Sequence, residues 1–542
     1  MDTIFYHGNI YTGDPAVPHC QAIAVKNGVI LALGQDKDTL MLASETTKCI
    51  DLQEKFVLPG FTDSHMHLLF YAQLSDMADL SAAASFQDVK EICRSRIPQA
   101  AAEHKWVQGI GFNQNFWSEK RIPTRLDLDE ISADVPITIR RACYHITVCN
   151  TAAMMAMGLM DEKKETTSVN MGFFADGTPD GTLREDSQNL VSAVLPVPSQ
   201  ADIESMILHA CQQAAAKGIT EIHTDDFQFL PGGCGDTILA AYRHLSETGQ
   251  LPIRIYQQCS LWDLPSLEHF LEKGYGTGMS FGHYRLGPLK LIGDGSLGAH
   301  TAWMRAPYQN DPSTCGKPNM TDEEIITLCQ TAHDHNMQIA VHCIGDAALE
   351  QALSALETVQ YRNPRTDCRH GIVHCQIMDH AQQLRFQQSS LLAYIQPVFL
   401  RSDMHIVDDC VGPSLGAQSY HWRRFADLHV HMSGGSDCPV EPFDILPNLE
   451  YAVTRTNPDT GVSWHPEHSL TLEEAIAAFT KEGAYASFSE NVRGTLTAGK
   501  YADLVVLDQD LFSIPPSEIH NVKVALTVVD GKVVYEKGSD CV

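Results

Sequence analysis

Two stretches of the chain place a helix pattern directly before an apolar strand pattern. In the first, a capping-box sequence begins at Ser199, apolar residues recur at helical spacing until Gly218, and the strand-like run ITEIHTDD follows at 219–226. The same order returns from Thr321 to Asn336, after which MQIAVHCIGD follows. Repeated units of this kind indicate a parallel sheet covered by helices.

This pattern predicts eight strands, the number that a (β/α)₈ TIM-like barrel requires. The interval between the first two is far too long for a single crossover connection, so residues at roughly 70–200 are predicted to form a large insertion. The barrel strands are expected near 58–67, 219–226, 253–259, 288–293, 338–343, 370–375, 391–396 and 430–436.

Both chain ends carry a different pattern, in which apolar and polar residues alternate over short runs. IFYHGNIYTG and AIAVKNGVILALG stand near the start, the second with Asn27 and Gly28 as a hairpin turn signal, and ADLVVLD, VALTVVDG and VVYEKG stand near the end. Neither set is large enough for a stable sheet by itself. We therefore predict one small β-sandwich from residues 1–57 plus 485–542, beside a barrel domain at 58–484.

The composition narrows the choice of partners and of location. The chain has 542 residues, 44% hydrophobic and 19% charged, and no run reaches the roughly 18 apolar residues of a membrane span. The start lacks the basic region and the continuous apolar region of a secretory signal, so we expect a cytoplasmic protein. The 16 cysteines include no CxxC pair, so we expect reduced thiols. A net charge of −29 disfavours nucleic acid and anionic membranes as partners.

Histidines and one aspartate stand at the ends of several predicted strands. His65 and His67 follow an apolar strand and, being two residues apart, share one face of it. His342, His374 and Asp437 end three other strands. Because the C-terminal ends of barrel strands open on one face, these side chains are expected to converge. Imidazole and carboxylate groups are suitable ligands for zinc and similar divalent ions.

Five motifs in this order, PGFTDSHMH, KLIGDGSLG, AVHCIGDAA, GIVHC and GGSDCPV, resemble the amidohydrolase superfamily. The resemblance extends to GTLTAGKYADLVVLD and VVDGKVVY near the end, so it covers nearly the whole chain. KLIGDGSLG together with HCIGD is similar to the YtcJ-like branch, which includes N-substituted formamide deformylase. The HxH pair and the late aspartate are typical of the superfamily at large.

The resemblance implies a centre of two divalent metal ions, with zinc as the expected metal. It makes His65, His67 and Asp437 ligands of the first ion and His342 and His374 ligands of the second.

Other residues are expected around these ions. Lys290 stands where binuclear members of the family have a carboxylated lysine that bridges both ions, and burial beside cations would favour the neutral amine that this modification needs. Glu185 in the insertion is the alternative bridging carboxylate. Asp294 is expected either to orient Lys290 or a ligand histidine, or to form the turn before Gly295.

The resemblance also places part of the insertion beside the substrate. Tyr144, His145 and Asn150 lie in a stretch that is similar to the substrate-side segment of the YtcJ-like branch. For His145, structural packing is an equal alternative. Trp117 is expected to line an apolar wall of the pocket, although aromatic residues at such positions are more often part of the core.

The expected function is hydrolysis of a non-peptide amide C–N bond in a small molecule by metal-activated water, with Asp437 moving the proton. A mononuclear deaminase is one alternative, although His342 is not followed by the glutamate of an HxxE motif. A non-catalytic regulatory barrel is the other, although every expected ligand is present. No glycine-rich phosphate loop with a following lysine appears, and the resemblance is compatible with a homodimer.

Overall fold

The chain divides into two compact units. The computed structural model describes residues 1–103, 105–143, 145–160 and 170–538. Among the described residues, no helix is long and apolar enough to cross a membrane. Unit 1 comprises Met1–Leu68, Ile207–Gln228 and Ile238–Val542, and unit 2 comprises Leu69–Met206 and Phe229–Thr237.

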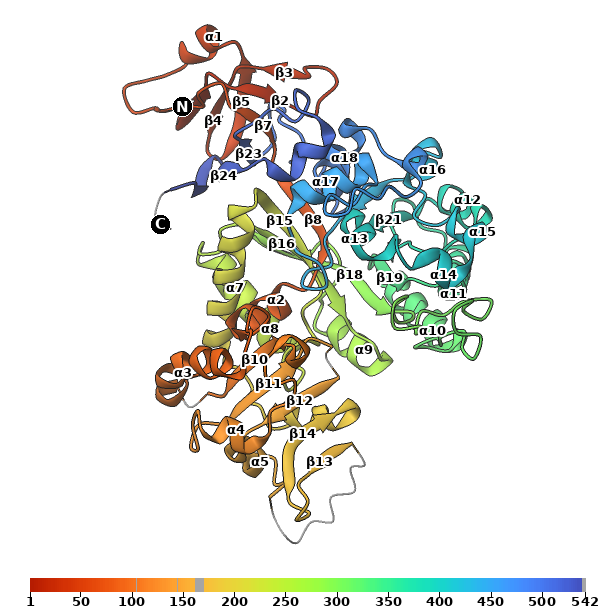
Figure 1. Cartoon of the computed structure of the whole chain (residues 1–542). Helices are drawn as coiled ribbons and strands as arrows, with labels where there is room; N and C mark the ends of the chain where they lie inside the picture. Colours follow the sequence, from red (N-terminus) through yellow and green to blue (C-terminus); the bar gives the residue numbers. More distant parts are fainter. Residues whose placement is uncertain (104, 144, 161–169, 539–542) are drawn as a thin grey trace. The chain divides into compact units, whose positions relative to one another are not determined.

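Eight parallel strands form a nearly closed barrel in unit 1 (Figure 1), as the predicted (β/α)₈ fold requires. They pair in the order β22-β21-β20-β19-β18-β16-β15-β8. Between the two end strands, the N–H of His67 donates to the carbonyl of Cys438 and the N–H of Asp437 donates to that of His65, both at 2.8 Å. The strands are β8 (Phe61–Met66), β15 (Ile219–Thr224), β16 (Arg254–Ser260), β18 (Tyr284–Ile292), β19 (Ile339–Cys343), β20 (Gly371–His374), β21 (Leu392–Ile395) and β22 (Met432–Gly434).

Helices alternate with these strands, and the two predicted capping boxes are confirmed. Before α7 (Gln200–Ala216), the N–H of Ser199 donates to the carboxylate of Asp202 at 3.0 Å, and the N–H of Asp202 donates to Ser199 Oγ at 3.2 Å. Thr321 and Glu324 form the same reciprocal pair at the start of α10. Further helices are α8 (Gly235–Glu247), α9 (Leu264–Glu272), α10 (Asp322–Asp334), α11 (Asp346–Arg362), α12 (His380–Gln388) and α18 (Leu472–Ala478).

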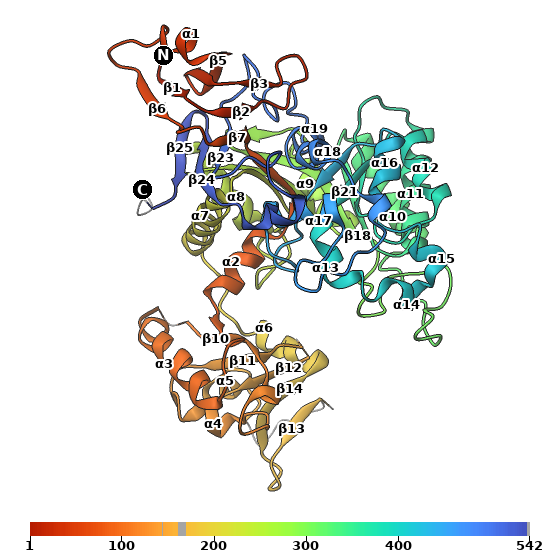
Figure 2. The same cartoon turned by 45° about the horizontal axis from the view of Figure 1, so that its top comes forward.

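Strands from both chain ends form two further sheets, with the orders β5-β4-β1-β6 and β25-β24-β23-β7-β2-β3. Asn27 and Gly28, with φ of 52° and 78°, make the predicted tight turn between β4 and β5. One buried cluster contains Ile23 from the first sheet and Val57 and Leu504 from the second. Figure 2 shows the red N-terminal and blue C-terminal strands side by side. The strands are β1 (Thr3–Tyr6), β2 (Asn9–Tyr11), β3 (His19–Cys20), β4 (Ala22–Lys26), β5 (Val29–Gly34), β6 (Lys48–Asp51), β7 (Phe56–Pro59), β23 (Leu504–Leu507), β24 (Val524–Val529) and β25 (Lys532–Glu536).

Unit 2 contains the segment predicted as an insertion and has a sheet of its own, in the order β13-β14-β12-β11-β10-β9. A separate hydrophobic core lies between this sheet and α3 (Phe86–Glu103). The strands are β9 (Ala78–Asp79), β10 (Val107–Phe112), β11 (Ile137–Arg141), β12 (Ile146–Cys149), β13 (Met171–Phe173) and β14 (Pro179–Arg184).

A buried ion pair ties the segment before the last strands to the barrel. Arg493 donates to Glu221 on β15, and each of these side chains is only 4% exposed. Glu221 also accepts from Ser487 Oγ at 3.0 Å and from His223 Nε2 at 2.9 Å. Burial favours the neutral carboxyl group, but the charge of Arg493 outweighs it and lowers the pKa of Glu221 to about 2. Both partners are therefore charged at neutral pH.

We predict that Arg493→Met destabilises unit 1 by about 3–5 kcal/mol, because it leaves the buried Glu221 carboxylate without its cation. The matched control is Arg243→Met, which removes a half-exposed pair with Glu247 and should cost less than about 1 kcal/mol. Urea denaturation of the full chain measures both. Equal loss of stability in the two variants would contradict the role assigned to the buried pair.

Candidate metal centre

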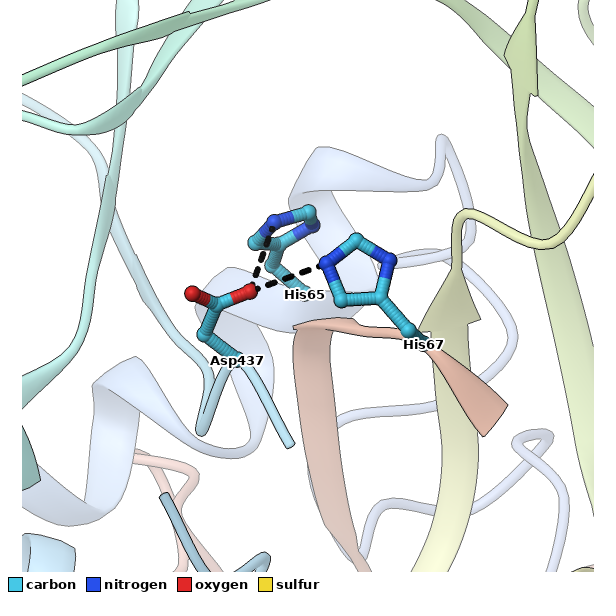
Figure 3. Close-up of side chains that lie close together, drawn as sticks. All are labelled: His65, His67 and Asp437. Atoms are coloured by element: carbon cyan, nitrogen blue, oxygen red, sulfur yellow. Dashed lines mark ion pairs between the residues drawn. The ribbon is translucent and has the colours of Figure 1, made fainter. Parts of the chain in front are cut away.

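His65, His67 and Asp437 bring three acceptor atoms together (Figure 3). Oδ1 of Asp437 lies 3.3 Å from Nε2 of His65 and 3.1 Å from Nε2 of His67. His65 is 1% exposed and Asp437 6% exposed, so water screens the cluster poorly. The two histidines lie at the end of β8 and Asp437 follows β22, the two strands at which the barrel closes.

Hydrogen bonds from the other ring nitrogens fix how the two imidazoles are oriented. Gln258 donates its amide N–H to the carbonyl of Ser64 at 3.1 Å, which leaves its Oε1 to accept from Nδ1 of His65 at 2.8 Å. Nδ1 of His67 donates to the carbonyl of Asp225 at 3.1 Å. In the neutral rings, the lone pair of each Nε2 is therefore available on the side of Asp437.

The charge states of His65 and Asp437 fit a bound cation. Burial, with a further contribution from the charge of Lys290, lowers the pKa of His65 to about 4, so this ring is neutral at physiological pH. Burial opposes ionisation of Asp437, but the neighbouring His65 and His67 lower its pKa well below the usual range. Among the described residues, Oδ1 of Asp437 has no hydrogen-bond partner. A carboxylate and imidazole lone pairs that converge in this way suit a divalent metal ion.

His342 and His374 continue this row of histidines. The ring of His374 lies 5.4 Å from that of His65 and 4.4 Å from that of His342, between ring centroids. Nδ1 of His374 lies 3.0 Å from Oε1 of Gln396. Nε2 of His342 donates to the carbonyl of Gly295 at 3.1 Å, so its Nδ1 keeps the lone pair. The structure thus places the predicted second ligand pair directly beside the first cluster.

Two of the predicted ligands lie in left-handed backbone. His374 has φ of 81° and Asp437 has φ of 57°. Residues other than glycine seldom adopt this conformation, and aspartate, asparagine and histidine do so more readily than most. In both cases the chain turns sharply just past a barrel strand.

Lys290 on β18 is fully buried and lies in an ion pair that the sequence did not predict. Its Nζ lies 3.5 Å from Oδ2 of Asp225. Neither Nζ of Lys290 nor either carboxylate oxygen of Asp225 has a hydrogen-bond partner within the described part of the chain. The bridging role of a carboxylated Lys290 stays a prediction.

Asp294 organises the turn beside His342. Its carboxylate accepts from the N–H groups of Trp303 at 2.8 Å, Ile344 at 3.0 Å and Gly345 at 2.8 Å, and Oδ1 lies 3.4 Å from Nε2 of His342. Asp294 thus holds the backbone after β19 and contacts the predicted ligand His342, and its orienting role stays a prediction.

His145 and Glu185 form a pair within unit 2. Nδ1 of His145 lies 2.9 Å from Oε2 of Glu185, and both side chains are exposed. The bridging role of Glu185 and the substrate contact of His145 stay predictions. Tyr144 lies outside the described residues.

Asn150 and Trp117 have structural roles within unit 2, and their substrate contacts stay predictions. The buried amide of Asn150 accepts from the N–H groups of Ile137 and Ala153 and donates to two carbonyls, all at 2.9 Å, so it caps α5 (Thr151–Ala156). Trp117 is 1% exposed in the core of unit 2, and its Nε1 donates to the carbonyl of Ala83 at 2.9 Å. Hydrogen bonding and burial thus account for both side chains within unit 2.

Three residues near the centre escaped the sequence analysis, namely Asp225, Gln258 and Gln396. Each stands at or just past the end of a barrel strand, which is the same signal that identified the histidines. They complete a pattern in which each of the eight barrel strands supplies a polar residue to this region.

Comparisons with known proteins add independent information. A family model described as "Amidohydrolase family" matches residues 48–535. The putative amidohydrolase YtcJ of Bacillus subtilis (strain 168) is 31% identical over 540 residues, which cover 99% of this chain and 100% of that protein. N-substituted formamide deformylase of Arthrobacter pascens is 26% identical, over 99% of this chain and 98% of that protein. The crystal structure of an uncharacterized metal-dependent hydrolase from Pyrococcus furiosus matches with a TM-score of 0.79 and 25% identity, over 94% of this chain and 99% of that one.

We predict that Gln258→Leu weakens metal binding by about 10–100-fold, because His65 loses the acceptor that orients its ring. The control is Gln351→Leu, which replaces another buried glutamine, on α11. Competition against a chromophoric chelator measures the affinity. Equal metal affinity in the two variants would contradict the orienting role of Gln258.

Proposed function

The chain belongs to the amidohydrolase family, and from this premise we propose that it is a metal-dependent hydrolase that cleaves a non-peptide amide C–N bond of a small molecule. The family resemblance predicted from the motifs is thereby confirmed. The observation that carries the proposal is the convergence of His65, His67 and Asp437 at the closing strands of the barrel. A relative named N-substituted formamide deformylase supports an amide as the substrate class.

Two sets of residues would hold divalent ions, with zinc as the proposed metal. His65, His67 and Asp437 would hold one ion, and His342 and His374 the other, with Lys290 or Glu185 as the bridging group. When bound, such ions lower the pKa of a water molecule and polarise the carbonyl oxygen of the substrate.

Asp437 is the residue proposed to move the proton. Its buried carboxylate accepts a proton from the attacking water and returns it to the nitrogen that leaves when the C–N bond breaks. His65 does not compete for this proton, because its Nδ1 donates to Gln258 and its Nε2 would hold the metal ion. Gln258 and the carbonyl of Asp225 hold the two imidazoles in place during the reaction. The products are a carboxylic acid and an amine.

The proposal extends to the architecture around the barrel. We propose that the two terminal sheets form one β-sandwich, supported by the single buried cluster to which both contribute. No residue of that cluster is among the proposed ligands.

A substrate screen tests the reaction type directly. Zinc-loaded protein is offered formamides, N-acyl amino acids and cyclic amides, and released amine and free ammonia are measured in parallel. Amine release supports the proposed amidohydrolase, and ammonia release alone would support the deaminase alternative. The absence of turnover on all of these classes would favour a non-catalytic barrel.

One observation favours a mononuclear alternative, namely the ion pair between Lys290 and Asp225. We nevertheless expect two tightly held zinc ions per wild-type chain after gel filtration from buffer that contains zinc and bicarbonate. Lys290→Ala should hold fewer ions, because this variant lacks the proposed bridging group. Elemental analysis measures the content, and Lys481→Ala on the surface is the control. A wild-type value near one would overturn the binuclear form and favour the mononuclear one.

We predict that Asp437→Asn lowers kcat by about 10²–10⁴-fold, because the amide cannot shuttle the proton. Asparagine tolerates the left-handed backbone of this position, so the melting temperature should change little. The exposed Asp409→Asn is the control. Melting temperature, metal content and turnover are measured on one sample. A folded, metal-loaded Asp437→Asn protein with normal turnover would refute the assignment.

A further inference from the structure

A second group of histidines lies outside the row at the barrel strands. His465 has a left-handed backbone, with φ of 46°, and precedes the short helix η4 (Pro466–His468). Nδ1 of His465 lies 3.0 Å from Oε1 of Glu467, and Nε2 of His468 lies 3.8 Å from the same oxygen. Within this turn, two imidazole nitrogens and one carboxylate oxygen all lie within 4.8 Å of one another.

His468 is the buried member of this group. It is 6% exposed, and its Nδ1 has no hydrogen-bond partner among the described residues. Its ring stacks on His421 with centroids 3.5 Å apart and lies parallel to His465 at 5.0 Å. Burial, together with the neighbouring His421, lowers the pKa of His468 to about 3. The ring is therefore neutral at physiological pH and offers a lone pair instead of a charge.

The charges and donor atoms around His468 indicate which kind of ion this group could bind. The buried cation Arg455 acts on His468 and lies over the rings of Trp422 and Trp464, at 4.6 and 5.1 Å from their centroids. Its Nε donates to the carbonyl of Trp464 at 3.0 Å. Glu467 provides the negative charge of the group. Two imidazole nitrogens and one carboxylate suit zinc and related transition ions better than magnesium or calcium, which prefer oxygen ligands.

We propose that His465, Glu467 and His468 form a further divalent-metal site for zinc or a similar transition ion, with water completing the coordination. The site shares no residue with the proposed hydrolytic centre and does not depend on the proposed function.

An ion at this site would hold the His465–His468 turn to a second element. His468 stacks on His421, whose Nδ1 accepts from the N–H of Arg424 at 3.2 Å and caps α16 (Trp422–Asp427). Fixing His468 in its present rotamer therefore also fixes the contact of this turn with the start of α16. Because the ion binds only the folded form, it should raise the melting temperature in proportion to its occupancy.

Calorimetric titration tests the site on the full chain. The tight sites are first loaded with zinc, free metal is removed by gel filtration, and zinc alone is then added at neutral pH. Wild type should take up one further ion with a rise in melting temperature, and His465→Ala and Glu467→Gln should each weaken this event at least about tenfold. The controls His19→Ala and Glu473→Gln replace exposed residues elsewhere and should bind as wild type does.

The further site is disproved if His465→Ala and Glu467→Gln bind the added zinc as tightly as their controls. A second measurement needs no variant: crystals of the wild type soaked in zinc should show anomalous scattering between the three side chains, and an empty position would also overturn the proposal. Asp437→Asn should retain the added zinc, because Asp437 is not one of the three ligands. Loss of hydrolysis in that variant therefore tests the hydrolytic centre separately.

Discussion

The barrel closes through hydrogen bonds between the segment around His65 and the segment around Asp437, and this closure also brings together the candidate metal ligands. The backbone groups of His67 and Asp437 each make one of the bonds that join the two segments. Asp63 adds two more contacts, because its carboxylate accepts from the N–H of Ser436 at 3.0 Å and from Ser436 Oγ at 2.5 Å. The ligands thus lie on the backbone that completes the sheet, so the distance between them is set by strand geometry instead of by flexible loops.

The two glutamines show how the rest of the barrel supports this arrangement. Gln258 and Gln396 come from different strands, and each places an amide oxygen on Nδ1 of a histidine, at 2.8 and 3.0 Å. An amide accepts this hydrogen bond without adding a negative charge. The carboxylates of Asp437, Asp225 and Asp294 supply the negative charge beside Lys290 and the imidazoles. The glutamines thus fix the orientation of the rings, while the carboxylates supply the charge that attracts a cation.

Much of the fold could be predicted because its signals are local. Helical spacing, capping boxes and apolar runs lie within one element each, and the strand-end rule found His342 and His374 without any knowledge of their neighbours. The ion pair of Lys290 with Asp225 reaches across β16, which lies between β18 and β15, so it depends on the strand order and could not be predicted from spacing. The roles of Asn150 and Trp117 could not be decided from the sequence for a related reason. A polar or aromatic residue in an insertion has the same appearance in the sequence whether it faces a ligand or the interior.

The left-handed backbone at Asp437 limits how this position changes during evolution. Branched residues such as valine and isoleucine are disfavoured there by the backbone alone, whereas asparagine and glycine are accepted. Both of those replacements arise from aspartate by a single nucleotide change, and both remove the carboxylate while keeping the turn. On the proposed mechanism, a descendant of this chain could therefore lose hydrolysis in one step and keep its fold.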